Sequence, residues 1–240
     1  MKFVCGNFKM NGSVSTISDY VKSLNELDPE VLENLCVCVP HPLLGFAQEA
    51  KFNLGAQDCY LEKHGAYTGD VSPTLLHECG AKYVLIGHSE RRKYHKETDS
   101  LVYKKALVAS QCHLTPIVCV GENKDQINDR YEVLRAQINA LSVKFNDKPI
   151  KSIMIAYEPV WAIGTGEIPE PKIIDSVCEF ISELAIKIFG RKINVLYGGS
   201  VNADNAEEIL ALKNVDGVLV GGACLEIEKF KPIINQASRY

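Results

Sequence analysis

The sequence predicts an α/β fold, and within that class a single-domain (β/α)8 barrel that spans residues 1–240. Three observations support this prediction: eight short apolar runs recur along the chain, segments with helical spacing separate most of them, and the chain has 240 residues. A barrel of this kind typically takes about 250 residues. An open, doubly wound parallel sheet is the structural alternative that the same pattern allows.

Each expected strand is a continuous apolar run rather than an alternation of apolar and polar residues. Such runs are typical of strands that are buried on both faces, as in a parallel sheet covered by helices. The eight runs are residues 3–5, 36–39, 54–56, 83–86, 117–120, 153–156, 195–197 and 218–220.

The segments between these runs place apolar residues three and four positions apart, which is the spacing of an amphipathic helix. The longest expected helix is 172–189, where Pro171 suits the first turn and Gly190 suits the end. Shorter helices are expected at 100–110 and 203–212, and at 131–141 within a segment expected to be helical from Asp125. Strands that alternate with helices throughout indicate an α/β protein.

Composition and charge exclude several classes of function. The chain has 26 Lys and Arg against 30 Asp and Glu, a net charge of −4, and therefore lacks the basic excess of a nucleic-acid binder. No apolar run approaches the length of a membrane span. Lys9 interrupts the first apolar stretch too early for a signal peptide. We therefore expect a cytoplasmic protein without nucleic-acid or membrane partners.

The nine cysteines form no Cys-x-x-Cys pair. In a cytoplasmic protein, cysteines of this kind are expected to be reduced thiols that pack as small hydrophobes. Cys36 and Cys38 lie two positions apart in an apolar run, which suits packing within a strand. We expect no metal and no cofactor.

Polar residues and glycines collect directly after the apolar runs. In a (β/α)8 barrel the carboxyl ends of all strands meet on one face, where active sites lie. A cation, Lys9, follows the first run, an imidazole, His88, follows the fourth, and a carboxylate, Glu158, follows the sixth. Gly-rich tips at 198–199 and 221–222 follow the last two runs, where barrels commonly bind phosphate through backbone N–H groups.

These groups together predict proton transfer on a small phosphorylated substrate. A carboxylate can take a proton from a carbon next to a carbonyl, while an imidazole and an ammonium group polarise the oxygen. The chain has no G-x-S-x-G, G-x-G-x-x-G or P-loop motif, which argues against acyl transfer and nucleotide binding.

Seven segments, in order along the chain, resemble motifs of the triosephosphate isomerase family, and the resemblance covers nearly the whole length. The segments are residues 6–12, 55–58, 65–69, 87–92, 156–166, 197–201 and 219–223. This family has the TIM-barrel fold and interconverts dihydroxyacetone phosphate and glyceraldehyde 3-phosphate without a cofactor. A sugar-phosphate epimerase, an indole-forming synthase and a barrel that only binds ligands are the alternatives.

The resemblance implies a role for each matched residue. Glu158 is the base that moves a proton between C1 and C2, and His88 donates a hydrogen bond to the carbonyl oxygen. Lys9 supplies positive charge, and Asn7 helps to hold the enediolate. His88 stands just before an expected helix start, which disfavours an imidazolium and favours a neutral donor. The backbone N–H groups expected to hold the phosphate are those of Gly164, Ser200, Gly221 and Gly222.

The family resemblance also implies a homodimer in which Thr68 of one subunit approaches the Asn7–Lys9 loop of the other. The chain departs from the family after the lid, where Glu167, Ile168 and Pro169 replace a common Lys-Thr-Ala. Because proline fixes φ, we expect slower or less complete lid motion than with a flexible hinge.

Several other residues receive secondary interpretations. We expect Glu90 to lie near Lys9, Arg91 and Arg92 to support the site and the subunit interface, and Trp161 to anchor the lid. Cys119 is expected to pack near the site, and Cys224 replaces a common serine with little effect. The remaining histidines, expected to be structural or at the surface, are His41, His64, His77, His95 and His113.

Overall fold

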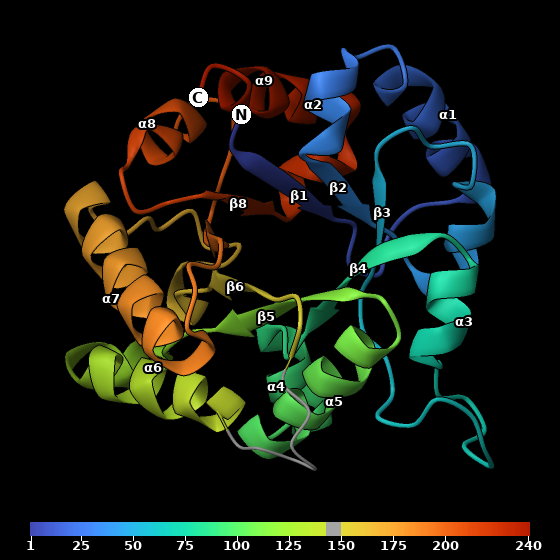
Figure 1. Cartoon of the computed structure of the whole chain (residues 1–240). Helices are drawn as coiled ribbons and strands as arrows, with labels where there is room; N and C mark the ends of the chain where they lie inside the picture. Colours follow the sequence, from blue (N-terminus) through green and yellow to red (C-terminus); the bar gives the residue numbers. More distant parts are fainter. Residues whose placement is uncertain (143–149) are drawn as a thin grey trace.

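Eight parallel strands close into one barrel in the computed structural model, which describes residues 1–142 and 150–240. Each strand pairs with the next, and the last pairs with the first, so no strand edge is left open (Figure 1). The predicted (β/α)8 barrel is confirmed, and the open sheet is wrong. The strands are β1 Phe3–Asn7, β2 Leu35–Cys38, β3 Asn53–Ala56, β4 Ala81–Ile86, β5 Thr115–Val120, β6 Met154–Tyr157, β7 Val195–Tyr197 and β8 Gly217–Val220.

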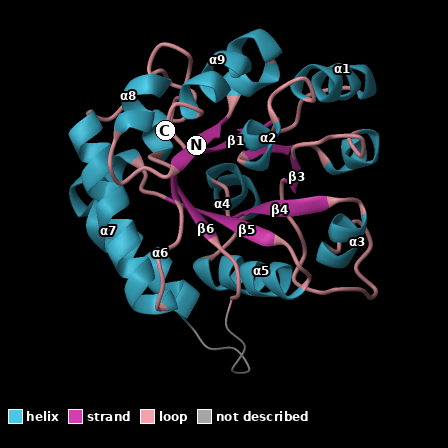
Figure 2. Ribbon diagram, turned by 45° about the horizontal axis from the view of Figure 1, so that its top comes forward, coloured by secondary structure: helices cyan, strands magenta, loops and turns pink. Residues whose placement is uncertain are grey.

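Helices surround the barrel and connect its strands, and Figure 2 shows them as an outer layer around the sheet. The α-helices are α1 Val14–Leu24, α2 Pro29–Glu33, α3 Pro73–Glu78, α4 Ser89–His95, α5 Asp99–Gln111, α6 Arg130–Asn139, α7 Pro171–Phe189, α8 Ala206–Ala211 and α9 Ile227–Ala237. Short 3₁₀ helices are η1 His41–Phe46, η2 Lys124–Asp129, η3 Ala140–Ser142, η4 Val160–Ala162 and η5 Gly222–Leu225.

The strands are buried on both faces, which explains their continuous apolar sequences. One side of each strand packs against the helices, and Val4 of β1 belongs to this outer core. The other side fills the barrel, where Cys5 of β1 meets inward-facing side chains from the other strands. Phe3, Cys36, Cys38, Leu85, Ile117, Cys119, Ala156, Leu196 and Leu219 complete this inner cluster.

The long helix α7 follows its sequence signals closely. Pro171 occupies the first turn, and Gly190 ends the helix in the left-handed conformation with φ of +67°. Helix α5 likewise contains the whole predicted segment 100–110. Of the described residues, no helix is both long enough and apolar enough to cross a membrane.

Two predicted helices differ from the structure. The segment from Asp125 is a 3₁₀ helix up to Asp129, where φ of −103° and ψ of 16° turn the chain before α6 begins. This turn lets Arg130 reach the buried Glu122 carboxylate at 2.7 Å. Helix α8 begins at residue 206 rather than 203, because the Asn202 side chain accepts from the N–H groups of Asp204 and Asn205 and closes a turn there.

Candidate active site

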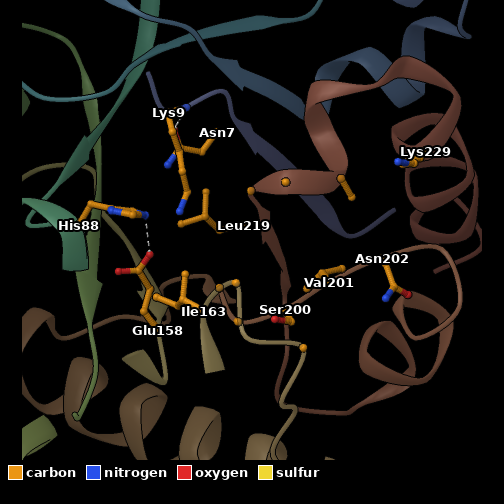
Figure 3. A pocket seen from close by; sticks show the side chains of 17 residues that line it. Asn7, Lys9, His88, Glu158, Ile163, Ser200, Val201, Asn202, Leu219 and Lys229 are labelled. Carbon is orange, nitrogen blue, oxygen red and sulfur yellow. Dashed lines mark hydrogen bonds and ion pairs between the residues drawn. The ribbon is translucent and has the colours of Figure 1, made fainter. Parts of the chain in front are cut away.

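The carboxyl ends of the strands surround a cavity of about 370 Å³. Figure 3 shows Lys9, His88 and Glu158 on one side of it and Ser200 on another. All eight residues that the sequence predicts for the site line this cavity: Asn7, Lys9, His88, Glu158, Gly164, Ser200, Gly221 and Gly222. Residues from five different strand ends and from the lid therefore meet in one place.

The end of β1 holds Asn7 and Lys9 in a fixed local geometry. Asn7 is buried, and its Oδ1 accepts a hydrogen bond from the Lys9 N–H at 2.9 Å. Lys9 has φ of +51°, a left-handed conformation that is uncommon for lysine. Gln57 stabilises this backbone by donating from Nε2 to the Lys9 carbonyl oxygen at 2.7 Å. The Lys9 ammonium group lies 2.6 Å from Oε1 of Glu90, as the sequence led us to expect.

His88 is the N-terminal cap of α4. Its Nδ1 accepts from the Glu90 backbone N–H at 3.3 Å, and its Nε2 lies 3.0 Å from Oε1 of Glu158. A neutral ring with its proton on Nε2 satisfies both contacts at once. The local sequence thus sets the tautomer that presents an N–H donor to the cavity.

Glu158 follows β6 and is 2% exposed. Besides His88, its carboxylate accepts a hydrogen bond from the Ser89 backbone N–H to Oε2 at 2.9 Å. This role of Ser89 cannot be predicted from the sequence, because a backbone N–H that donates to a carboxylate 69 positions away requires no particular side chain. The position of Glu158 also depends on Gly121, where a Cβ atom would lie 1.6 Å from the Glu158 carbonyl oxygen.

The two buried groups shift each other's pKa in opposite directions. Burial by itself would raise the pKa of Glu158, but His88 and the Ser89 N–H outweigh burial, so the pKa is lowered. Burial by itself would lower the pKa of His88, but the Glu158 carboxylate outweighs it, so the pKa is raised. The neutral donor expected for His88 therefore depends on where Glu158 lies, because the upward pKa shift comes mainly from the Glu158 carboxylate, with a smaller contribution from Glu90.

Backbone groups dominate the opposite wall of the cavity. Gly221 and Gly222 lie at the start of η5, and Ser200 lies after β7 with its Oγ donating to the Ala162 carbonyl oxygen at 2.6 Å. Lys229 of α9 also lines this end, although it follows no motif that could have marked it in the sequence. Backbone N–H groups next to cationic side chains suit a phosphate group.

The segment that follows Glu158 up to Gly166, which the family resemblance matches to a lid, connects Glu158 to this wall. Trp161 stands at the lid's start and donates from Nε1 to Oε1 of Glu122 at 3.0 Å, which fits the predicted anchor. The same carboxylate accepts from Tyr157 Oη at 3.1 Å. At the far end, Glu167 is exposed and lies 3.6 Å from the Lys124 ammonium group, whereas Pro169 is buried.

The two arginines after His88 support the surrounding structure, as the sequence suggested. Arg91 pairs with Asp58 at 2.9 Å and with Glu97 at 2.8 Å. Arg92 pairs with Asp99 at 2.6 Å and donates to two backbone carbonyl oxygens below the site. These contacts hold α4, and with it His88, against the barrel.

A barrel of this kind, with its polar groups gathered at the carboxyl ends of the strands, belongs to the (β/α)8 enzymes. A family model described as triosephosphate isomerase matches residues 2–237. The chain belongs to the triosephosphate isomerase family, whose members are aldose–ketose isomerases.

Curated relatives carry the same name. A triosephosphate isomerase from Carboxydothermus hydrogenoformans is 40% identical over 97% of both chains. One from Finegoldia magna is 38% identical over 97% of both chains, and one from Albidiferax ferrireducens is 41% identical over 98% of both. These comparisons give no support for the alternative of a sugar-phosphate epimerase.

The opposite pKa shifts predict how the Glu158–His88 pair stabilises the fold at different pH. The lowered Glu158 pKa contributes stability above about pH 4.3 that is lost as the pH falls through the folded value. The raised His88 pKa contributes stability below about pH 6.5 that is lost as the pH rises through the folded value. The unfolding free energy of the wild type minus that of Glu158→Gln should therefore peak between these two limits.

Urea unfolding of both proteins across the pH range measures this difference. The exposed Glu179 on α7 provides a control, and Glu179→Gln should show no such peak. A difference that climbs steadily from acid to alkaline pH would contradict the coupling of the two groups.

Proposed function

We propose that Glu158, His88, Lys9 and Asn7 carry out the interconversion of dihydroxyacetone phosphate and D-glyceraldehyde 3-phosphate. The observation that carries this proposal is the contact of the Glu158 carboxylate with the His88 Nε2 at 3.0 Å in a cavity that Lys9 also lines. The chain is a triosephosphate isomerase, and this reaction is a step of glycolysis and gluconeogenesis.

The base must leave its resting contacts before it can act. In the structure both Glu158 oxygens are occupied, one by His88 and one by the Ser89 N–H. When substrate binds, the carboxylate turns to the C1 carbon, takes a proton from it, and leaves the electron pair on an enediolate. The same carboxyl group then returns the proton to C2, while the hydroxyl proton moves from O1 to O2, so that no proton is gained or lost overall.

The other groups stabilise the charge that develops on the substrate oxygens. Once Glu158 turns away, the main cause of the raised His88 pKa is removed, and the Glu90 N–H still occupies Nδ1. His88 then donates from Nε2 as a neutral imidazole. The Lys9 ammonium group and the Asn7 amide supply further donors to the same oxygens.

The phosphate and the lid protect the reactive intermediate. We assign the phosphate to the N–H groups of Gly221, Gly222, Ser200 and Gly164, all of which line the cavity. Gly164 belongs to the lid, so phosphate binding favours closure. A closed lid excludes water and limits loss of phosphate from the enediolate.

Shortening the base tests this mechanism. Glu158→Asp withdraws the carboxylate by one methylene group, about 1 Å, and a misplacement of that size can reduce turnover about 10²-fold. A coupled assay with glyceraldehyde 3-phosphate and no added metal should show this loss in kcat with a small change in KM. Glu179→Asp, at an exposed position of α7, is the matched control and should retain wild-type turnover. Equal turnover in both variants would contradict Glu158 as the base.

The segment that carries Thr68 is suited to contact a second subunit. Figure 1 shows the connection between β3 and α3 projecting from the barrel. Tyr67 is 42% exposed and packs on Tyr60, and Met10, next to Lys9, is 96% exposed. We propose that the Thr68 loop of one subunit covers Met10 and approaches the Asn7–Lys9 loop of the other, which makes the protein a homodimer.

A charge placed in this loop should separate the subunits. Light scattering should show a dimer for the wild type and a monomer with strongly reduced activity for Thr68→Arg. Ile186→Arg on α7 introduces the same charge at another exposed apolar position and should remain a dimer. An active wild-type monomer at nanomolar concentration would contradict the proposal.

The hinge after the lid should limit its motion. Pro169 is buried and has a fixed φ, so opening requires neighbouring residues to absorb the rotation. We expect the triple variant Glu167→Lys, Ile168→Thr, Pro169→Ala to open severalfold faster. Trp161 is the chain's only tryptophan and stands at the lid's start, so its fluorescence after a temperature jump reports the rate. Unchanged opening and turnover rates would refute the expectation.

We place this reaction in the cytoplasm and in one catalytic domain of residues 1–240. The nine cysteines are all free thiols, which suits a reducing compartment. Pairing of β1 with β8 supports a single domain, because both ends of the chain contribute to the same closed sheet.

A further inference from the structure

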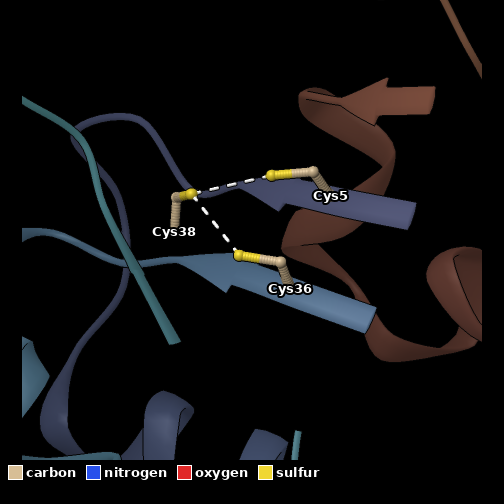
Figure 4. Close-up of side chains that lie close together, drawn as sticks. All are labelled: Cys5, Cys36 and Cys38. Atoms are coloured by element: carbon tan, nitrogen blue, oxygen red, sulfur yellow. Dashed lines mark hydrogen bonds between the residues drawn. The ribbon is translucent and has the colours of Figure 1, made fainter. Parts of the chain in front are cut away.

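Three thiols meet inside the barrel below the candidate active site. Cys5 lies on β1, and Cys36 and Cys38 lie on β2, and all three are fully buried. Figure 4 shows their sulfur atoms converging. Sγ of Cys38 lies 3.6 Å from that of Cys5 and 4.0 Å from that of Cys36, and all three sulfurs are within 4.8 Å of one another.

The two sulfur–sulfur distances from Cys38 match those of thiolates bound to one central atom, and the third pair lies within 4.8 Å. Sulfurs that surround a planar trigonal centre at about 2.3 Å, the length of a zinc–thiolate bond, lie about 4.0 Å apart, and a pyramidal centre brings them closer. The two short sulfur–sulfur distances in the barrel are therefore already close to those of an occupied site. Little movement of β1 or β2 is needed to fill it.

The neighbouring strand leaves room for the sulfurs. At Gly55 of β3 a Cβ atom would lie 2.3 Å from Sγ of Cys38 and 3.0 Å from Sγ of Cys36. A side chain at this position would displace the thiols, so glycine is part of the cluster's geometry. The remaining inner cluster is mostly aliphatic and aromatic, with Phe3, Leu85 and Leu219 among its members.

The net charge of the complex determines which central atom the three thiols can bind in this interior. The thiols lie in an apolar interior, where an uncompensated charge is costly. Zinc with three thiolates leaves one negative charge and lacks the fourth ligand that structural zinc sites have. A monovalent ion with three thiolates leaves two negative charges. A trivalent atom bound to three thiolates is neutral and needs no fourth ligand.

We propose that Cys5, Cys36 and Cys38 form a binding site for a trivalent thiophilic centre, represented by arsenic(III). Arsenous acid reacts with the three thiols, and three arsenic–oxygen and three sulfur–hydrogen bonds break. Three arsenic–sulfur bonds form and three water molecules leave. No atom changes oxidation state, and the neutral thiols become a neutral complex.

The site is connected to the candidate active site through β1 and β2. Asn7 lies two positions after Cys5 on the same face of β1 and is the register partner of Cys38. Gln57 donates from Nε2 both to the Lys9 carbonyl oxygen at 2.7 Å and to that of Cys38 at 3.2 Å. Drawing the sulfurs together therefore shifts the backbone that holds Asn7 and Lys9. This coupling, unlike the binding site, rests on the proposed function.

Sodium arsenite is the probe, and binding is measured independently of activity. Because the thiols are buried, arsenite is added by two routes. In one the native chain is incubated with arsenite, and in the other the chain is refolded from urea in its presence. Excess reagent is then removed. Intact mass spectrometry should show one arsenic in place of three hydrogens. X-ray absorption at the arsenic edge should show three sulfur neighbours and no oxygen.

Two alanine variants separate this site from general thiol reactivity. Cys36→Ala leaves two sulfurs, so arsenic should retain one hydroxyl group. It should bind about hundredfold more weakly, because the variant loses a third arsenic–sulfur bond that forms within the same molecule. Cys178→Ala removes a thiol that is equally buried but lies on α7, and should bind like the wild type. Circular dichroism verifies that both variants fold.

Each outcome bears on a separate part of the proposal. The proposed site would be wrong if neither loading route gave arsenic bound to three sulfurs. It would also be wrong if Cys36→Ala still gave that species. If the protein bound zinc or cadmium tightly but did not bind arsenite, the proposed class of ligand would be wrong. Isomerase activity should fall about tenfold or more as the wild type loads, given how sharply rates depend on position. Full activity in the loaded protein would overturn only the coupling to Asn7 and Lys9.

Discussion

Closure of the parallel sheet by the pairing of β1 with β8 is the constraint on which the rest of this structure depends. Once the sheet closes, all eight strands point their carboxyl ends at one rim, and side chains from distant parts of the chain must meet there. Lys9, His88 and Glu158 reach one cavity for this reason. Closure buries the inner face of the sheet and the surrounding helices cover the outer face, which is why the strand sequences are mostly continuous apolar runs.

In this barrel, hydrogen-bond donors of the protein itself hold the Glu158 carboxylate. Its two oxygens accept from His88 and from the Ser89 N–H, and these bonds keep it ionised in a buried setting. In the proposed mechanism, substrate replaces these contacts. The same movement of Glu158 takes its carboxylate away from His88 and so removes the main cause of the raised His88 pKa.

The inner face of the barrel below the candidate site holds a group of thiols. Directly below Asn7, three cysteines pack opposite Gly55, where a side chain would displace them. Their sulfurs form a compact triangle because β1 and β2 are adjacent in register. The proposed thiophilic site is therefore part of the same two strands that position Asn7 and Lys9.

The sequence by itself determined the eight strands, helices α5 and α7, and the identity of the groups at the rim, because periodicity and strand-end motifs are local properties. It also indicated the cap at His88 and the end of α7 at Gly190. It did not determine that Ser89 holds Glu158, or that Cys5 lies against Cys38. These contacts join residues far apart along the chain, and only barrel closure and strand register bring them within bonding distance. The turn before Arg130, which brings this residue to the buried Glu122 carboxylate, was likewise not apparent from the sequence.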